Sequence, residues 1–463
     1  MLAKWYDVAH VDDNLRLLNE FLDAPRASYE ISLPAISLFS GAGISDIGYE
    51  QAGFRFVIQV EIDENRANLC ERNFPHSLVL KNDITKCHQE IIQCYQERSN
   101  ERLHLLSVTP PCQGMSSSNP GRGKITKIED RDERNQLVLA AIPIICGLLP
   151  RIVVVENVSQ ILKESVTTDR GKSKPIIDIF REELQAEYQI FTGVVQIADY
   201  GIPQTRKRAI IVAIHKDEAC LRGLKRNSAL PWPKAKHSET LTKGLLDWIT
   251  ISQWLEFQEY PQLDAASINT AVSLDDPLHR VPCYEDHPDR YLWVSDIPSR
   301  SGKNAYQNLN CRACGFTPVP EKLTRCPQCN EPMRNRPYVI EKDGSFRLIK
   351  GFHSSYRRMS PNKPAPTVMT NSSHLGSDYK IHPWENRVMS IRECADIQTI
   401  PHFYDWNWAF ETGHVYTTRQ VIGEALPTWF TYLHGSALRQ LLFNRIEKGV
   451  LEKRVPKQKK LTN

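Results

Sequence analysis

The sequence predicts an α/β protein, in which a doubly wound parallel sheet is joined to a second, smaller and irregular domain that carries a metal module. Three observations lead to this fold class. Short apolar runs alternate with longer amphipathic stretches over residues 34–214, which is the pattern of repeated βαβ units. The alternation stops over residues 215–355, which are rich in Pro, Trp, Tyr and His. Two Cys-x-x-Cys pairs lie within that second stretch.

The composition is that of a globular chain with more than one domain. Its 463 residues are 41% hydrophobic and 24% charged, which is too long for one compact core and too apolar for disorder. No stretch approaches the roughly 18–20 apolar residues that a membrane span needs, and the amino terminus lacks a secretory apolar region. We therefore expect an intracellular protein without membrane contact, whose twelve cysteines are thiols or metal ligands.

The expected elements follow the chain in order. Residues 1–33 contain a helical pattern at 15–22, closed by Pro25, and form an accessory helix. The sheet domain covers residues 34–214, with strands at 35–39, 56–60, 103–108, 152–155 and 209–214. The irregular domain covers residues 215–355. Residues 356–436 return to complete the sheet domain, with helices expected at 391–398 and 429–443, and residues 437–463 form a helix end and a basic tail.

The first expected strand leads into a glycine-rich loop, Phe39-Ser40-Gly41-Ala42-Gly43. Glycines let the backbone approach a ligand, and the free N–H groups of the following helix face that ligand. Glu61 ends the next strand, where a carboxylate can accept both ribose hydroxyls, and Asp83 follows the third apolar run, where it can receive an adenine amino group. The combination favours a nucleoside-containing cofactor, with a simple glycine-rich turn as the alternative.

Cys112 follows the strand at 103–108 and two stiffening prolines. A lone cysteine in this position is usually inert and buried, but the polar loop at 116–124 has the composition of a segment that closes over a phosphate-bearing substrate. A nucleophilic role requires a lowered thiol pKa or proton transfer during attack.

Three more residues have candidate chemical roles. Glu156 follows a β-branched run and is either a pocket acid, able to donate a proton to a ring nitrogen, or an N-cap partner. Arg206 and Arg208 are two apart in an extended segment, so they point to the same side and could grip a phosphate or a base edge. A solvated basic turn is the alternative for these arginines.

Positive charge is concentrated in two segments of a chain whose net charge is only +4. Residues 300–350 contain ten Lys and Arg against four Asp and Glu, and residues 437–463 contain eight against two. This distribution favours contact with phosphates, although the tail could equally be only solvated.

Taken together, the motifs resemble the cytosine-5 DNA methyltransferases that use S-adenosylmethionine, over residues 36–214 and 364–433. They occur in the family's order: the loop at 39–43, Pro111-Cys112-Gln113, the segment at 132–137, Glu156-Asn157-Val158, the run at 204–208, the helix at 390–398 and Gly423-Glu424-Ala425-Leu426-Pro427.

The resemblance implies a Rossmann-like class I methyltransferase sheet and a mechanism. Cys112 would add to C6 of a cytosine extruded from the duplex, while Glu156 protonates or hydrogen-bonds N3 and C5 takes the methyl group. Arg206 and Arg208 would complete the catalytic site, and the loop at 116–124 would support base extrusion. The implied cofactor-binding residues are Phe39, Gly41, Gly43, Glu61, Ile62, Asp83, Ile84, Pro111, Leu137, Glu424 and Leu426.

The sequence departs from the family pattern at two positions. Glu424 stands where the family usually has Asn, beside the methionine part of the cofactor, so its carboxylate could repel that of the cofactor unless it is turned away or protonated. Ile44 replaces a usual second glycine and narrows the pocket slightly.

Cys311, Cys314, Cys326 and Cys329 form two knuckles, the spacing of a structural Cys₄ zinc site. The module lies where the family keeps its variable target-recognition domain. Basic residues of this segment are candidates for phosphate or base contacts, although the module could be only a fold staple or a protein contact: Arg312, Lys322, Arg325, Arg334 and Arg336.

The resemblance implies a double-stranded DNA substrate and a place in bacterial restriction–modification or phage defence, in the bacterial cytoplasm or nucleoid, with protein partners of a defence system a further option. Two other functions remain open: methylation of RNA cytosine, and a non-catalytic DNA-binding assembly subunit. The long middle domain favours duplex DNA, because reading a sequence in the major groove needs extra surface. The target sequence and the oligomeric state cannot be predicted.

Overall fold

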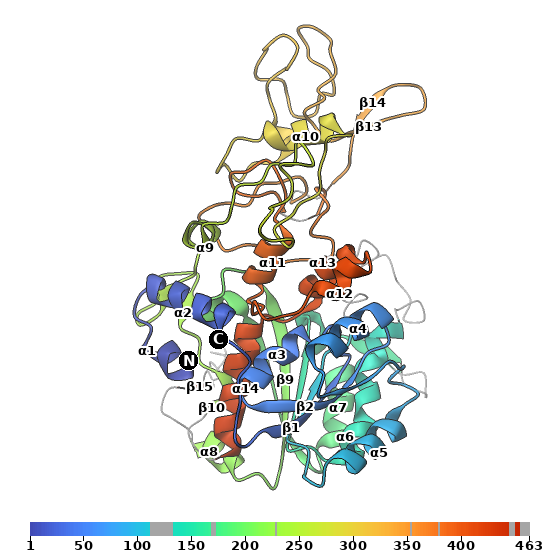
Figure 1. The fold of residues 1–463 in the computed structure, drawn as a ribbon, viewed down its shortest axis with the longest axis vertical. Helices are drawn as coiled ribbons and strands as arrows, with labels where there is room; N and C mark the ends of the chain where they lie inside the picture. The colour runs from blue at the N-terminus through green and yellow to red at the C-terminus, as the bar shows by residue number, and fades with distance from the viewer. Residues whose placement is uncertain are drawn as a thin grey trace, which may run out of the picture.

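The computed structural model describes residues 1–111, 133–167, 173–226, 229–351, 354–377, 380–443 and 450–453. Cys112, the loop at 116–124, Asp132 and most of the basic tail lie outside the described residues. Within them the protein has a lower body built on a sheet and an irregular upper part that projects from it (Figure 1). No helix in these ranges combines the length and the hydropathy needed to cross a bilayer.

The lower body contains a seven-stranded sheet in the order β3-β2-β1-β4-β5-β9-β8. Its strands are β1 (Leu33–Leu38), β2 (Phe54–Val60), β3 (Leu78–Leu80), β4 (Leu105–Val108), β5 (Ile152–Asn157), β8 (Tyr188–Gln196) and β9 (Lys207–His215). The five strands from β3 to β5 are parallel. Strand β9 is antiparallel to both β5 and β8, so the doubly wound sheet that the sequence predicted is parallel through its first five strands and mixed as a whole.

Helices cover both faces of the sheet, because side chains alternate between the faces along each strand. Leu105 faces one apolar core and Leu106 the other. The first core is closed by α1 (Leu2–Asp7), α2 (Val11–Asp23), α3 (Ile44–Gln51), α4 (Glu64–Asn73) and α14 (Thr428–Leu442). The second is closed by α5 (His88–Arg98), α6 (Ile142–Leu148) and α7 (Ile176–Leu184).

Short elements connect the sheet body to its surroundings. The helical turns are η2 (Glu133–Ala141), η3 (Ser159–Leu162) and η4 (Ile197–Tyr200), with α8 (Cys220–Arg226) after the sheet. The paired strands are β6 (Ser165–Thr167) with β7 (Ser173–Pro175), β10 (Ala229–Pro233) with β15 (Leu451–Lys453), and β11 (His237–Ser238) with β12 (Leu246–Asp247). Pairing of β10 with β15 brings the last described residues beside the accessory helices, where the Tyr6 hydroxyl donates to the Val450 carbonyl at 2.9 Å.

The irregular upper part has its own small core. Its elements are α10 (Pro288–Ser295), η5 (Ala305–Gln307), β13 (Tyr338–Ile340) and β14 (Phe346–Leu348). This core extends from Leu263 to Val388, whereas Trp232 and α9 (Ile251–Gln258), with Trp254, pack against the sheet body. The core limits therefore differ from the boundaries expected at 215 and 355, because the periodicity of a short apolar segment does not reveal which core it joins.

The returning chain supplies α11 (Ile391–Ile397), α12 (Asn407–Glu411) and α13 (Val415–Glu424) before α14. Figure 1 shows these helices in red and orange at the junction of the two parts, with α14 running down along the sheet body. Helix α14 packs closely on α3, so the first and last thirds of the sequence share one core.

Candidate active site and metal module

The ends of β1, β2, β4 and β5 border a cavity of about 1250 Å³. Ligands collect at this edge of a doubly wound sheet. Of the described residues that the sequence singled out, the following line it: Phe39, Gly41, Glu61, Ile62, Asp83, Ile84, Pro111, Leu137, Glu156, Arg206, Arg208 and Glu424.

Gly43 and Leu426, also expected to bind the cofactor, are not among the lining residues. Gly43 caps α3 with φ 72°, and a Cβ there would lie 2.4 Å from the Phe74 ring. Leu426 is buried, and its N–H donates to the Ser45 hydroxyl at 2.9 Å. Both residues therefore lie behind the cavity lining and support the backbone that forms it.

The nucleoside side of the cavity is organised around Glu61. Its two carboxylate oxygens accept the N–H groups of Gly41 at 2.9 Å and Asp63 at 2.8 Å. Burial raises the pKa of Glu61, against the effect of these hydrogen bonds. These hydrogen bonds hold the glycine-rich loop against the end of β2, so a ribose in this part of the cavity would contact both the loop and the strand end.

Asp83 lies on the same side of the cavity, at its solvent edge. Its Oδ1 accepts the hydroxyl of Thr85 at 2.8 Å and the N–H of Thr85 at 3.0 Å. These hydrogen bonds lower the pKa of Asp83, so the group is an ionised acceptor. The neighbouring side chains differ in exposure: Ile84 is buried, whereas Ile62 is 68% exposed and presents an apolar surface beside the cavity.

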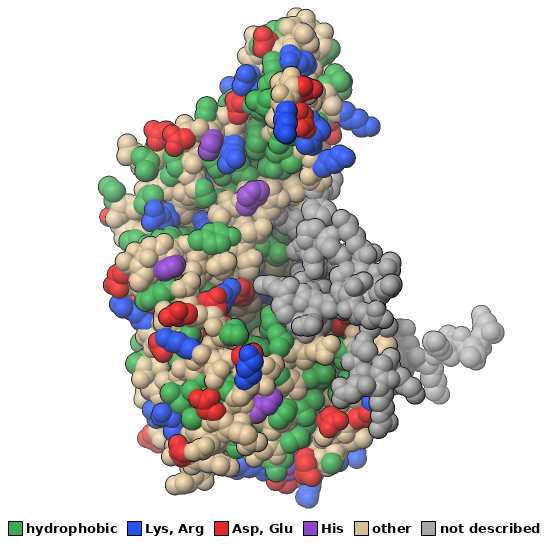
Figure 2. Space-filling model, turned by 90° about the vertical axis from the view of Figure 1, so that its right-hand side faces the viewer, with side chains coloured by type: hydrophobic (Ala, Val, Ile, Leu, Met, Phe, Trp, Pro, Cys, Tyr) green, Lys and Arg blue, Asp and Glu red, His purple; other side chains and the backbone are tan. Residues whose placement is uncertain are grey.

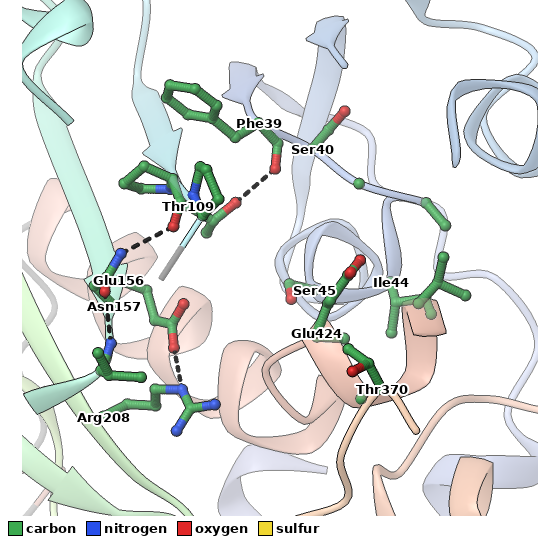
Figure 3. A pocket seen from close by; sticks show the side chains of 18 of the residues that line it. Phe39, Ser40, Ile44, Ser45, Thr109, Glu156, Asn157, Arg208, Thr370 and Glu424 are labelled. Carbon is green, nitrogen blue, oxygen red and sulfur yellow. Dashed lines mark hydrogen bonds and ion pairs between the residues drawn. The ribbon is translucent and has the colours of Figure 1, made fainter. Parts of the chain in front are cut away.

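The opposite side of the cavity holds the acid that the sequence singled out. Glu156 lies on β5, and its Oε1 is 2.8 Å from Nε of Arg208 on β9, with only 12% of either side chain exposed. Figure 3 shows the two side chains pointing toward each other. The antiparallel direction of β9 explains the pairing, because it brings the start of that strand to the edge where β5 ends.

Two residues that sequence reasoning did not single out position the segment before Cys112. Asn157 donates to the Pro110 carbonyl at 2.9 Å, and Thr109 donates to the Phe39 carbonyl at 2.9 Å (Figure 3). Asn157 stands within the Glu-Asn-Val motif, so a signal for it existed. Pro111 is the last described residue before Cys112 and lines the cavity.

Arg206 has a different environment from Arg208. Its side chain is buried and donates to the carbonyls of Val368 at 3.2 Å, Gly423 at 3.1 Å and Glu424 at 3.0 Å. These contacts tie the returning segment to the sheet. Arg206 thus binds backbone carbonyls, whereas Arg208 pairs with Glu156. This arrangement does not support the expectation that the two arginines together bind a phosphate or a base edge. Both side chains are also too buried for the alternative, a solvated turn.

Glu424 is paired, which the sequence did not predict. Arg66 donates to its two carboxylate oxygens at 2.8 and 2.7 Å. Figure 3 shows Glu424 beside Ser45 and Thr370, on the side of the cavity away from Glu156. The hydrogen bond to Glu424 raises the pKa of Arg66. Nothing in the sequence motifs marked Arg66, because its partner is 358 residues away.

The four cysteines of the expected metal module converge. Their Sγ atoms all lie within 4.8 Å of one another, with Cys311 to Cys329 at 3.6 Å and Cys314 to Cys326 at 3.7 Å. A tetrahedron with Zn–S bonds of about 2.3 Å has edges of about 3.8 Å, so the donor set fits a zinc ion. Each knuckle closes on a residue with positive φ, Gly315 or Asn330, which leaves room for both thiols to face the centre.

The basic residues of the module are largely engaged within the protein. Arg312 pairs with Asp296 and Arg334 with Asp289. Arg336 is fully buried and donates to the carbonyls of Asn308, Val319, Pro320 and Leu323. For this candidate the structure favours the fold-staple alternative over contact with DNA, because the guanidinium holds the module together. Lys322 and Arg325 are exposed, and Figure 2 shows Lys and Arg interleaved with Asp and Glu on the projecting part.

Comparison with known proteins gives consistent results. The family model described as C-5 cytosine-specific DNA methylase matches residues 33–433. Type II methyltransferase M1.HgaI of Avibacterium volantium is 26% identical over 410 residues, covering 86% of this chain and 95% of that protein. Type II methyltransferase M1.HphI of Haemophilus parahaemolyticus is 24% identical, covering 86% and 84%.

A solved structure from E. coli, described as a "putative DNA modification methyltransferase" encoded within a prophage, shares the fold. It has a TM-score of 0.50 and 21% identity, over 89% of this chain and 100% of that one.

Proposed function

Because the chain belongs to the C-5 cytosine-specific DNA methylase family and is a DNA (cytosine-5) methyltransferase, we propose that it methylates one specific cytosine in duplex DNA through Cys112, Glu156 and Arg208. The names of its relatives are consistent with a role in restriction–modification, in which it would act on bacterial DNA in the cytoplasm. The observation that carries the assignment of residues is the Glu156–Arg208 pair, which faces the same cavity as the glycine-rich loop.

The cavity residues fit S-adenosylmethionine, the cofactor that the family implies. Glu61 and Asp83 offer acceptors for a ribose and an adenine, the glycine-rich loop lines the cavity, and Ile62 offers an apolar surface for a base. When bound, the cofactor would supply an electrophilic methyl group.

The protein side chains would prepare cytosine C5 as the acceptor. The Cys112 thiolate would add to C6, while Glu156 protonates or hydrogen-bonds N3, so that electron density moves to C5. After C5 has gained a methyl group, its proton would pass to water, the C6–sulfur bond would break, and N3 would return to Glu156 any proton that it had received, which restores the ring and the thiolate. Arg208 would hold the Glu156 carboxyl at the cavity wall throughout.

Zinc would act as a fold staple of the upper part. The closed Cys₄ donor set leaves no open position for substrate. With Arg336 buried and two arginines paired to aspartates, Lys322 and Arg325 are the better candidates for phosphate contact. The Glu424 carboxylate could have repelled that of the cofactor and so favoured the non-catalytic alternative, but its pairing with Arg66 compensates this charge.

Methyl transfer from labelled S-adenosylmethionine to duplex DNA tests the proposal, with bisulfite sequencing to locate the product. We expect 5-methylcytosine at one sequence and its loss in Cys112→Ser. Glu156→Gln should lower kcat about 10²- to 10⁴-fold with unchanged binding of S-adenosylhomocysteine. The control Glu183→Gln changes an exposed carboxylate on α7 and should leave the rate unchanged.

Two results would contradict the proposal: undiminished methylation by Cys112→Ser, or transfer to RNA in preference to DNA when both are offered.

A further inference from the structure

Arg66 and Glu424 lie in an unusual electrostatic setting on the cavity wall. Arg66 is the third residue of α4 and Glu424 is the last residue of α13. Helix dipoles disfavour a cation in the first turn and an anion in the last turn. Arg66 and Glu424 therefore each lie at the helix end where the dipole destabilises their charge. Asp63 also pairs with Arg66 at 2.6 Å, and Glu424 tends to raise the pKa of Glu61, as a nearby like charge does.

Stability does not account for this placement. The Arg66 side chain is 19% exposed and that of Glu424 33% exposed, and ion pairs with such solvent access contribute about 1 kcal/mol or less. The backbone around Glu424 is already held without its carboxylate. Arg206 donates to the Glu424 carbonyl, and Ser45 accepts the N–H of Leu426. The charged pair is therefore available for a ligand in the cavity that both residues line.

We propose, on the basis of the proposed methyl-transfer function, that Arg66 and Glu424 form the subsite for the zwitterionic amino-acid end of the cofactor. Glu424 accepts hydrogen bonds from the α-ammonium group. Arg66 compensates the charge of Glu424, so that the carboxylate of the same ligand is not repelled. The two side chains are specificity-determining residues for the cofactor, and they act as a unit.

The geometry agrees with this assignment. The nucleoside acceptors Glu61 and Asp83 lie at the ends of β2 and β3, and the catalytic pair lies at the end of β5. Glu424 is on the side of the cavity away from that pair, beside Ser45 (Figure 3). An ammonium and a carboxylate on one carbon require both signs of charge within a few ångströms, and the Arg66–Glu424 contact at 2.7 Å supplies them.

Three ligands separate the parts of the subsite in calorimetric titrations. S-adenosylhomocysteine carries both charges, its decarboxylated analogue lacks the carboxylate, and 5′-methylthioadenosine lacks the amino-acid end. Glu424→Gln should weaken S-adenosylhomocysteine about 10- to 100-fold, the usual effect of losing a charged hydrogen bond, and should weaken the decarboxylated analogue likewise.

Arg66→Gln should weaken S-adenosylhomocysteine by a similar factor, because it leaves Glu424 facing the ligand carboxylate without compensation, and should affect the decarboxylated analogue less. The double variant should bind S-adenosylhomocysteine better than the product of the two single effects predicts. Binding of 5′-methylthioadenosine should stay within about twofold in all variants, which also shows that the pocket is folded.

Arg72→Gln is the matched control, since Arg72 lies on the same helix and pairs with Asp405 away from the cavity lining; it should bind all three ligands as the wild type does. Equal weakening of all three ligands by Glu424→Gln, or no weakening, would overturn the subsite while leaving the methyltransferase function intact if 5-methylcytosine still forms. Failure of the wild type to bind S-adenosylhomocysteine would overturn both.

Discussion

At the scale of single residues, Asp46 shows how a buried group near the glycine-rich loop adds to the pH dependence of stability. It lies in the first turn of α3, is 2% exposed and accepts hydrogen bonds from Ser37 on β1 at 3.0 Å and Gln59 on β2 at 2.9 Å. Burial raises its pKa from 3.8 to about 7. The carboxyl thus connects the two strands whose ends carry the glycine-rich loop and Glu61.

We predict that Asp46→Asn flattens the pH dependence of stability. Between pH 4 and 7 the folded protein keeps a proton on Asp46 that the unfolded chain has released, so the free energy of unfolding falls as pH rises through this window. The difference between a pKa of 3.8 and one of about 7 corresponds to about 4 kcal/mol as an upper bound. Urea denaturation at pH 5, 6, 7 and 8 measures the slope for both proteins.

The exposed Asp247→Asn provides the control for this change, and its profile should follow the wild type. Identical profiles for Asp46→Asn and the wild type would show that Asp46 stays ionised throughout.

Residues at strand ends could be predicted from the sequence, and residues that bind distant backbone could not. Glu61, Asp83 and Glu156 were predicted because a carboxylate after an apolar run must lie at one edge of the sheet. Arg206 and Arg336 were candidates for contact with nucleic acid, but each is buried against carbonyls from other segments. The local sequence around an arginine is the same whether its guanidinium binds backbone carbonyls inside the protein or a phosphate of a ligand.

At the scale of elements, the apolar pattern predicted which residues form strands, but it did not predict the direction in which each strand runs. Residues 209–214 were correctly expected in the sheet, but an apolar run reads the same in either direction, and β8 was not expected at all. Helix α7 lies between β5 and β8, so that β8 has the same direction as β5, and the short connection from β8 to β9 then reverses β9 relative to both strands. This reversal brings Arg208 to Glu156.

Of the elements of this protein, we predict that the metal module depends most on a bound ligand, the zinc ion, for its stability. Its buried apolar set comprises only Cys311, Val319, Cys326 and Met333, which is too small to fold without a staple. We expect about one zinc ion per chain by mass spectrometry. Removal by a chelator, or Cys329→Ser, should speed hydrogen exchange over residues 308–336 and abolish DNA binding, while S-adenosylhomocysteine binding is retained.

Cys146→Ser, which changes an exposed cysteine on α6, is the control and should retain zinc, slow exchange and DNA binding. Unchanged exchange after complete metal removal would refute the structural role.

At the scale of the whole molecule, the cavity depends on parts of the chain that are far apart in sequence. Its walls combine the loop after β1 with residues 421–425, and Gln204 donates to Gln398 at 2.9 Å where the returning segment meets the sheet. The family resemblance predicted that residues 356–436 return to the sheet body. It did not show how closely α14 approaches α3, because that distance depends on small residues at the contact, Gly48 and Gly435 among them.

Gly48 helps to set this approach, and we predict that Gly48→Ala destabilises the protein by about 2 kcal/mol. A Cβ at Gly48 would lie 2.0 Å from the Thr431 hydroxyl and 2.2 Å from the Thr428 carbonyl, so the backbone of α14 must move.

Gly147→Ala is the matched control in α6, where the Cβ would meet only the end of the Ile92 side chain, at 2.4 Å, which can rotate away. Urea denaturation should show a clear loss for Gly48→Ala and a small change for Gly147→Ala. S-adenosylhomocysteine binding should weaken only in Gly48→Ala, because α14 follows directly from the segment that carries Glu424. Equal stability of the two variants would show that α14 can shift without cost, and that the cavity wall does not depend on this contact.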